Sequence, residues 1–124
     1  MLIRALILIA VIAACSLAAP GENPVAGRWA GRSPDPIGRT EEVELRFTVT
    51  DAGLTGMLVT PDHQFPVAKI QLHGQRLTFD VTRELRGRNI VYHYDGWLSE
   101  ETLAFTVQND DGSSFFRFAT HRAR

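Results

Sequence analysis

Apolar and polar residues alternate along most of the chain after residue 26. This is the period of a β-strand with one dry face and one wet face. In the clearest run, 42–50, the apolar residues Val43, Leu45 and Phe47 alternate with charged or hydroxyl-bearing ones, and 76–82 repeats the pattern. No segment after residue 25 has a helical period. The pattern therefore predicts an all-β domain.

Short turn signals separate the apolar runs, as in Asp51-Ala52-Gly53 and Asn109-Asp110-Asp111-Gly112. Asx and Gly residues supply the positive φ angles that tight hairpins need. Such short links join antiparallel neighbours only, so we expect an up-and-down meander of about eight strands. The predicted strands are 27–33, 41–50, 54–60, 64–72, 75–82, 89–98, 102–108 and 113–120.

An open meander of this kind would leave two unpaired strand edges. Closure into a small barrel removes them, so a closed antiparallel barrel is the expected architecture. A two-sheet sandwich is the alternative, and it would need a longer crossing connection. The longest link, 33–40, contains Pro34, Pro36 and Gly38 and fits a loop over the barrel mouth.

The start of the chain has a different pattern. Arg4 precedes an apolar run, 5–14, which is the layout of a secretory signal. About ten apolar residues reach only ~15 Å as a helix, roughly half of a bilayer core. The small, polar and proline-containing stretch that follows is typical of a flexible tether. We therefore divide the chain into a cleaved signal peptide (1–14), a tether (15–25) and a β-barrel domain (26–124).

The string Ile12-Ala13-Ala14-Cys15 resembles the lipobox of bacterial lipoproteins. The resemblance implies that Cys15 becomes a lipidated N-terminus and anchors the protein in the bacterial envelope, facing the periplasm. Ser16 in place of Asp favours the outer membrane. The alternative is plain cleavage after Ser16-Leu17-Ala18, which gives a soluble periplasmic or secreted protein. Cys15 is the only cysteine, so no internal disulfide can form.

Charge excludes one class of partner. The formal net charge is −1, and loss of Arg4 with the signal leaves 12 basic and 14 acidic residues, or −2. A nucleic-acid-binding domain would carry a basic face, so no nucleic-acid partner is expected. The one basic cluster, Arg83, Arg86 and Arg88, is interrupted by Glu84 and indicates a solvated hairpin tip.

The polar residues form no catalytic or metal-binding pattern. The four histidines include no His-x-His or His-x-x-x-His pair, and no cysteine remains to complete a zinc site. No Gly-x-Ser-x-Gly elbow is present, and the pairs Glu41-Glu42 and Glu100-Glu101 fall at strand edges or turns. We therefore predict no enzymatic activity, no metal and no cofactor.

Aromatic residues fall on nearly every predicted strand. Alternation in Tyr92-His93-Tyr94 favours tyrosines that point inward and a histidine that points to solvent. Eight strands leave room either for packed side chains or for one small ligand. If a cavity exists, the expected ligand-binding residues are Trp29, Tyr92, Tyr94 and Trp97.

The string Gly27-Arg28-Trp29, followed by the meander, resembles the calycin architecture of lipocalins, fatty-acid-binding proteins and avidins. Gly53-Leu54-Thr55-Gly56 is similar to the second-strand start of avidins. In lipocalins the Trp closes one barrel end under an Arg of the last strand. The resemblance therefore implies barrel closure by Trp29 and Arg117, with Arg122 as the second candidate.

The chain departs from these families in two ways. It has no C-terminal helix, and Gly31 stands where avidins carry an Asn, so biotin binding is not implied. The resemblance implies a lipid-anchored lipocalin-like barrel that binds a small hydrophobic ligand. The alternative is an envelope module that contacts a protein partner and has a filled barrel without a ligand.

Overall fold

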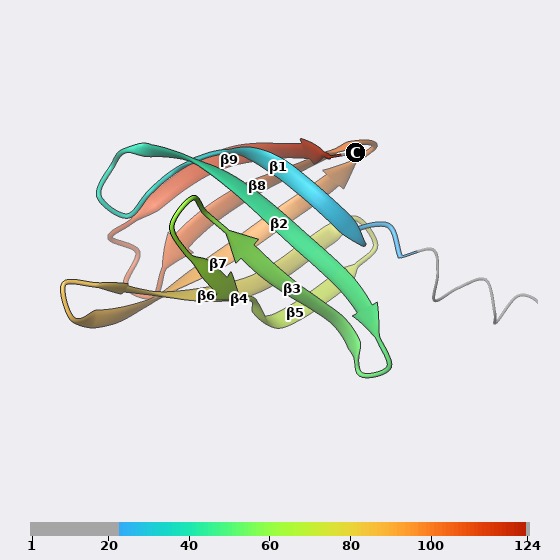
Figure 1. Ribbon diagram of the computed structural model, residues 1–124, viewed down its shortest axis with the longest axis horizontal. Coiled ribbons are helices and arrows are strands. Elements are labelled where there is room, and N and C mark those ends of the chain that lie inside the picture. The colour runs from blue at the N-terminus through green and yellow to red at the C-terminus, as the bar shows by residue number, and fades with distance from the viewer. Residues whose placement is uncertain (1–22, 124) are drawn as a thin grey trace, which may run out of the picture.

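The computed structural model describes residues 23–123, which form one antiparallel sheet of nine strands without helices (Figure 1). This confirms the predicted all-β antiparallel class. Within the described residues, no helix has the length and apolarity that a membrane crossing requires. The predicted signal peptide, Cys15 and most of the tether lie outside the described residues. The strands are β1 (Gly27–Pro34), β2 (Thr40–Thr50), β3 (Gly53–Val59), β4 (Gln64–Pro66), β5 (Ala68–His73), β6 (Arg76–Leu85), β7 (Arg88–Ser99), β8 (Thr102–Asn109) and β9 (Phe115–Arg122).

The strands follow the chain around the sheet in the order β4-β3-β2-β1-β9-β8-β7-β6-β5. Each hairpin joins antiparallel neighbours, as the short links predict. The one long-range pairing joins β1 to β9, where Trp29 lies opposite Arg122. The first and last strands of the domain are therefore side by side in the middle of the sheet (Figure 1).

One predicted strand is split in two. The segment predicted as a single strand, 64–72, changes partner at Val67: β4 pairs with β3, and β5 pairs with β6. The sheet thus has nine strands and not eight. β4 and β5 are its two ends and no ladder joins them, so the expected closure into a continuous barrel is not seen. The bond from the Val67 N–H to the Gly56 carbonyl (3.0 Å) extends the pairing of this segment with β3 by one residue beyond β4.

The local sequence explains the change of partner. Pro66 has no backbone N–H, so it cannot extend a ladder and ends β4. Lys69 has a φ of 55°, a left-handed conformation that a regular strand does not contain. The register between β5 and β6 shifts between Ala68 and Gln71, which is a bulge. These irregularities leave apolar side chains of β3 and β5 only partly covered, among them Leu54, Ile70 and Leu72.

Aromatic rings fill the interior of the curled sheet. Five of them, from five different strands, form one connected cluster in which Phe79 contacts three others. Edge-on and offset ring contacts each add about 0.5–1.5 kcal/mol to the burial of the rings themselves. The centroid distances are 5.8 Å for Phe47–Phe79, 4.8 Å for Phe79–Tyr94, 5.6 Å for Phe79–Phe105 and 5.2 Å for Phe105–Phe118.

Two interior glycines make room for this cluster. Gly56 lies opposite Phe47, and Gly96 lies opposite Phe105. A Cβ atom at Gly56 would be 2.8 Å from the Phe47 ring, and one at Gly96 would be 2.6 Å from the Phe105 ring. Each ring therefore occupies the space that a side chain on the neighbouring strand would take.

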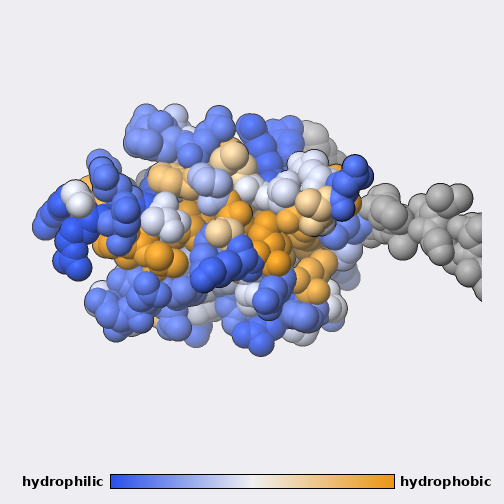
Figure 2. Space-filling model, turned by 90° about the horizontal axis from the view of Figure 1, so that it is seen from below, coloured by the Kyte–Doolittle hydropathy of each residue, from blue (hydrophilic) through white to orange (hydrophobic). Residues whose placement is uncertain are grey.

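Hydrophobic residues also reach the surface on one side. Figure 2, seen from below, shows them gathered along the middle of the molecule between hydrophilic groups. In Figure 1 the end strands β4 and β5 lie on this lower side. Phe65 and Val67, in and next to β4, are partly buried apolar residues that pack against the core. The break in the sheet therefore coincides with incomplete cover of the core.

We predict that Gly96→Ala lowers the free energy of unfolding by about 1–3 kcal/mol, because the new methyl group would overlap the Phe105 ring. Adding Phe105→Leu removes the overlapping ring atoms, so the double variant should lose less than the sum of the single losses. Chemical denaturation of the four proteins measures this coupling. Wild-type stability in Gly96→Ala would mean that the ring is not held against β7.

Candidate functional site

The structure does not bring the four predicted ligand-binding residues together. Trp29 is sealed from solvent, and Tyr92 and Tyr94 are each 4% exposed inside the sheet. Trp97 is 54% exposed. It lies on the outer face of β7, because it is three positions from Tyr94 and five from Tyr92, and side chains an odd number of positions apart point to opposite faces of a strand. His93 also points outward, as the alternation predicts.

Trp29 is buried between the start of the domain and the last strand. Its indole N–H donates to the Val25 carbonyl (3.0 Å), and the Arg122 guanidinium carbon lies 4.3 Å from the centre of its ring. Arg122 also donates to the carbonyls of Pro24 (2.6 Å) and Ala26 (2.8 Å), which fixes the start of the domain to its last strand.

The first choice for this arginine, Arg117, is wrong. Arg117 lies over the Phe115 ring, 5.6 Å from its centre, on the outer face of β9. Side chains alternate between the two faces of β9, so the even-numbered residues Phe118 and Thr120 point inward. Arg122 is also even-numbered and lies on the same face. The second candidate therefore covers Trp29.

One end of the interior opens into a hollow of about 500 Å³, which we call the β4–β6 hollow. It forms where β4 pairs with β3 and leaves the end of β6 without a strand beside it. Its walls come from the loop before β2, the turn between β3 and β4, β4 itself and the end of β6. The lining residues are Asp35, Pro36, Ile37, Arg39, Glu41, Thr60, Asp62, His63, Phe65, Arg83, Glu84 and Leu85.

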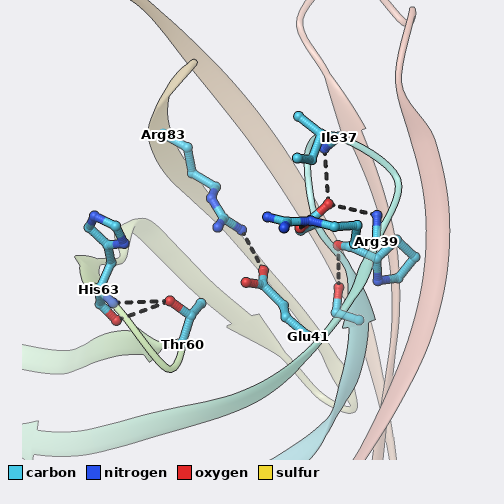
Figure 3. Close-up of polar contacts among 9 residues, drawn as sticks. Ile37, Arg39, Glu41, Thr60, His63 and Arg83 are labelled. Carbon is cyan, nitrogen blue, oxygen red and sulfur yellow. Dashed lines mark hydrogen bonds and ion pairs between the residues drawn. The ribbon is translucent and has the colours of Figure 1, made fainter. Parts of the chain in front are cut away.

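An ion pair crosses the β4–β6 hollow. The Arg83 Nη1 donates to the Glu41 carboxylate (3.0 Å), and the two side chains are only 14% and 17% exposed (Figure 3). The Arg83 guanidinium also lies over the Phe65 ring, 4.6 Å from its centre. Arg83 thus connects β6 to both β2 and β4 across the gap that the ladder leaves.

His63 extends the aromatic wall of the hollow. Its ring stacks on Phe65 with centroids 5.7 Å apart and planes 24° from parallel. The turn that positions it is held by Thr60, whose N–H donates to the His63 carbonyl (2.9 Å) and whose hydroxyl accepts from the His63 N–H (3.2 Å). Figure 3 shows this turn facing Arg83 and Glu41.

The loop before β2 forms the opposite rim. The Asp35 carboxylate accepts from the N–H groups of Ile37 (3.0 Å) and Arg39 (2.8 Å) and from the Arg39 side chain (3.1 Å). Desolvation raises the Asp35 pKa, but these donors outweigh it, so the net pKa is lower than usual. The tight loop leaves Ile37 54% exposed at the rim.

Two phenols lie within the electrostatic reach of Arg83. Burial raises the pKa of Tyr92 and of Tyr94, and the Arg83 charge partly opposes both shifts. Neither hydroxyl has a hydrogen-bond partner among the described residues. In that part of the chain, every side-chain N or O atom that is fully buried has a hydrogen-bond partner. The two tyrosine hydroxyl oxygens are therefore not fully buried, and each keeps some solvent-accessible surface.

The hollow presents both apolar and charged side chains. It combines apolar surface from Ile37, Phe65 and Leu85 with ion pairs that are already satisfied. Within residues 23–123, no cluster of three or more His, Cys, Asp or Glu side chains is arranged to hold a metal ion. No sequence signal could have paired Glu41 with Arg83, because 42 positions separate them.

Comparison with known proteins gives no match: no protein-family model, curated protein or solved structure is similar to the chain beyond chance. The resemblance to lipocalins and avidins therefore rests on the strand pattern and short motifs of this chain alone.

We predict that Arg83→Met lowers the free energy of unfolding by about 1–3 kcal/mol, since it leaves the largely buried Glu41 carboxylate without its charged donor. Arg39→Met is the matched control: Arg39 also pairs with a carboxylate, but its side chain is 76% exposed, so the loss should stay below about 1 kcal/mol. Equal losses in the two variants would show that the Arg83 pair does not bridge the gap.

Proposed function

We propose that the protein is an exported, lipid-anchored module of the bacterial envelope that binds a protein partner through the rim of the β4–β6 hollow. The observation that carries this proposal is the filled interior. Phe47, Phe79, Tyr94, Phe105 and Phe118 occupy the space in which a carrier barrel would hold its ligand. Recognition is therefore assigned to the surface.

We treat the curled sheet as a small barrel of lipocalin-like type. The segment 64–73 supports this interpretation, because it runs between β3 and β6 and pairs first with one and then with the other. The Arg83–Glu41 ion pair joins β6 to β2 across the break, and the Val67–Gly56 hydrogen bond continues the pairing of the shared segment with β3. In this interpretation the barrel is closed by a strand that is shared between two neighbours.

The rim has the composition of a protein-binding surface. Ile37 is an exposed large apolar residue, and Arg83, Phe65 and His63 lie next to it around the hollow. Arginine and aromatic side chains supply much of the binding energy in protein interfaces, where neighbouring contacts exclude water.

The direction of the tether fits this assignment. The chain enters the domain beside Trp29, at the end of β1 opposite the loop before β2 (Figure 1). A domain anchored through Cys15 would therefore hold its Trp29 end toward the membrane and present the β4–β6 hollow to the periplasm.

A small hydrophobic ligand in the same hollow is the second candidate. The volume of about 500 Å³ lies within the usual range of ligand pockets, and Phe65, Ile37 and Leu85 supply apolar walls. This alternative moves the predicted ligand from the interior to the hollow and keeps the protein without catalytic activity.

Cys15→Ser tests the anchor. Without a thiol to carry the lipid, the protein should move from the membrane fraction to the soluble periplasmic fraction, as measured by fractionation and by mass spectrometry of the mature N-terminus. Retention of the variant in the membrane fraction would rule out anchoring through Cys15.

A photo-crosslinking residue tests the rim. Placed at Ile37 in the full chain, it should give a discrete protein adduct in living cells, because Ile37 projects from the proposed interface. Val49 is a matched control: it is also an exposed apolar residue (37%), but it lies near the opposite end of β2. Equal adducts at both positions would contradict the assignment, and an adduct with a small molecule alone would favour the second candidate.

A further inference from the structure

A row of polar side chains crosses the outer face of five strands, away from the β4–β6 hollow. The ladder registers place the members of this row directly beside one another, and all of them have the outward parity. At about 4.8 Å between strands, the row is roughly 19 Å long. It consists of Gln71, Thr78, Asp95, Thr106 and Arg117 on β5 to β9.

An exposed tryptophan flanks this polar row. Trp97 lies next to Ala104, which lies next to Ala119, so small side chains leave the space beside the indole open. A hollow of about 810 Å³ lies there, lined by Trp97, both alanines and Arg117. A second hollow of about 510 Å³ adjoins it over β5 to β8, and both are lined by Arg76, Asp95 and Thr106.

Most charged groups of this face are paired with one another, whereas Arg117 lies over the Phe115 ring and has no carboxylate partner among the described residues. Arg76 makes a two-pronged contact with Asp95 (3.0 and 2.9 Å). His93 lies between Asp80 (2.7 Å) and Asp110 (2.5 Å), and the Lys69 ammonium is 4.0 Å from Asp80. Hydrogen bonds that the Asp80 carboxylate, and next the Asp110 carboxylate, accept from the His93 ring raise the His93 pKa. The cationic side chains of Lys69, Arg76 and Arg117 balance the carboxylates of Asp80, Asp95 and Asp110, so the face offers no large net charge to select an anion or a cation.

Neutral hydrogen-bonding groups remain free on the same face. The side chains of Gln71, Thr78, Thr106 and Gln108 line the smaller hollow and make no side-chain hydrogen bond within the described part of the chain. Amides and hydroxyls both donate and accept, so they suit a ligand rich in hydroxyl groups.

We propose that this face binds a neutral oligosaccharide. The apolar C–H face of one sugar ring packs on the Trp97 indole over Ala104, and the hydroxyl groups of the next rings bond to the polar row. A purely apolar ligand would leave the row unsatisfied, and a polyanion would meet the carboxylates of Asp80, Asp95 and Asp110. The proposal does not depend on the lipid anchor or on the β4–β6 hollow.

The two tryptophans make the test specific. Trp97 is exposed and Trp29 is sealed, so the two indole N–H resonances give a reporter and an internal reference in one spectrum. The full mature chain is titrated separately with three uncharged tetrasaccharides: cellotetraose, chitotetraose and maltotetraose. We expect at least one to shift the Trp97 resonance in a saturable way, with a Kd of about 1 mM or tighter, and to leave Trp29 unchanged.

Variants separate stacking from folding. Trp97→Ala should weaken binding at least about tenfold, as measured by calorimetry, and Trp97→Phe should retain part of it. Val49→Ala removes an exposed apolar residue of β2, outside this face, and should bind as wild type. A thermal unfolding curve shows whether each variant is folded. Thr106→Val removes one hydroxyl group from the polar row and should also weaken binding.

Three results would overturn the proposal. The first is no shift of the Trp97 resonance with any of the three sugars at about 10 mM, tenfold above the expected Kd. The second is binding that persists unchanged in Trp97→Ala and Thr106→Val. The third is a Trp97 shift that follows protein concentration without sugar, which would make this face a contact between copies of the chain.

Discussion

The fold depends on the packing of large aromatic rings against glycines inside a small curled sheet. Phe47 and Phe105 fit because Gly56 and Gly96 stand opposite them, where any side chain would collide with the rings. The rings that stabilise the sheet also occupy its interior, because protein interiors are closely packed. Both binding sites that we propose therefore lie outside the interior, at one end of the sheet and on its outer face.

Pro66 and the left-handed backbone conformation of Lys69 impose a second constraint, on how the strands pair. They end the pairing of one segment with β3 and start its pairing with β6, which leaves the sheet unclosed by a continuous ladder. Side chains take over where backbone bonds are missing: Arg83 contacts Glu41 and Phe65 across the gap. The same gap provides the β4–β6 hollow, so the break in the sheet and the candidate site have one cause.

Much of the fold could be predicted from the sequence, because period-two alternation and Asx-Gly turns act locally. The split at Val67 could not, since Val67 and its neighbours continue the strand pattern and only Pro66 hints at an end. The alternation of side chains along a strand could have corrected the assignments of Trp97 and Arg117. Trp97 is out of phase with Tyr92 and Tyr94, and Arg117 is out of phase with Phe118, so both point outward. The Arg83–Glu41 pair depends on tertiary distance and leaves no local signal.

The central claim is that the interior is filled and holds no ligand. Xenon tests it directly, because xenon enters apolar cavities that are too small or too dry for other probes. Methyl NMR of Leu45, Leu58, Leu103 and Val107, all buried in the core, is recorded under rising xenon pressure. The filled interior predicts only weak shifts that grow linearly with pressure. Shifts of these methyl groups that saturate would reveal an internal cavity and contradict the account.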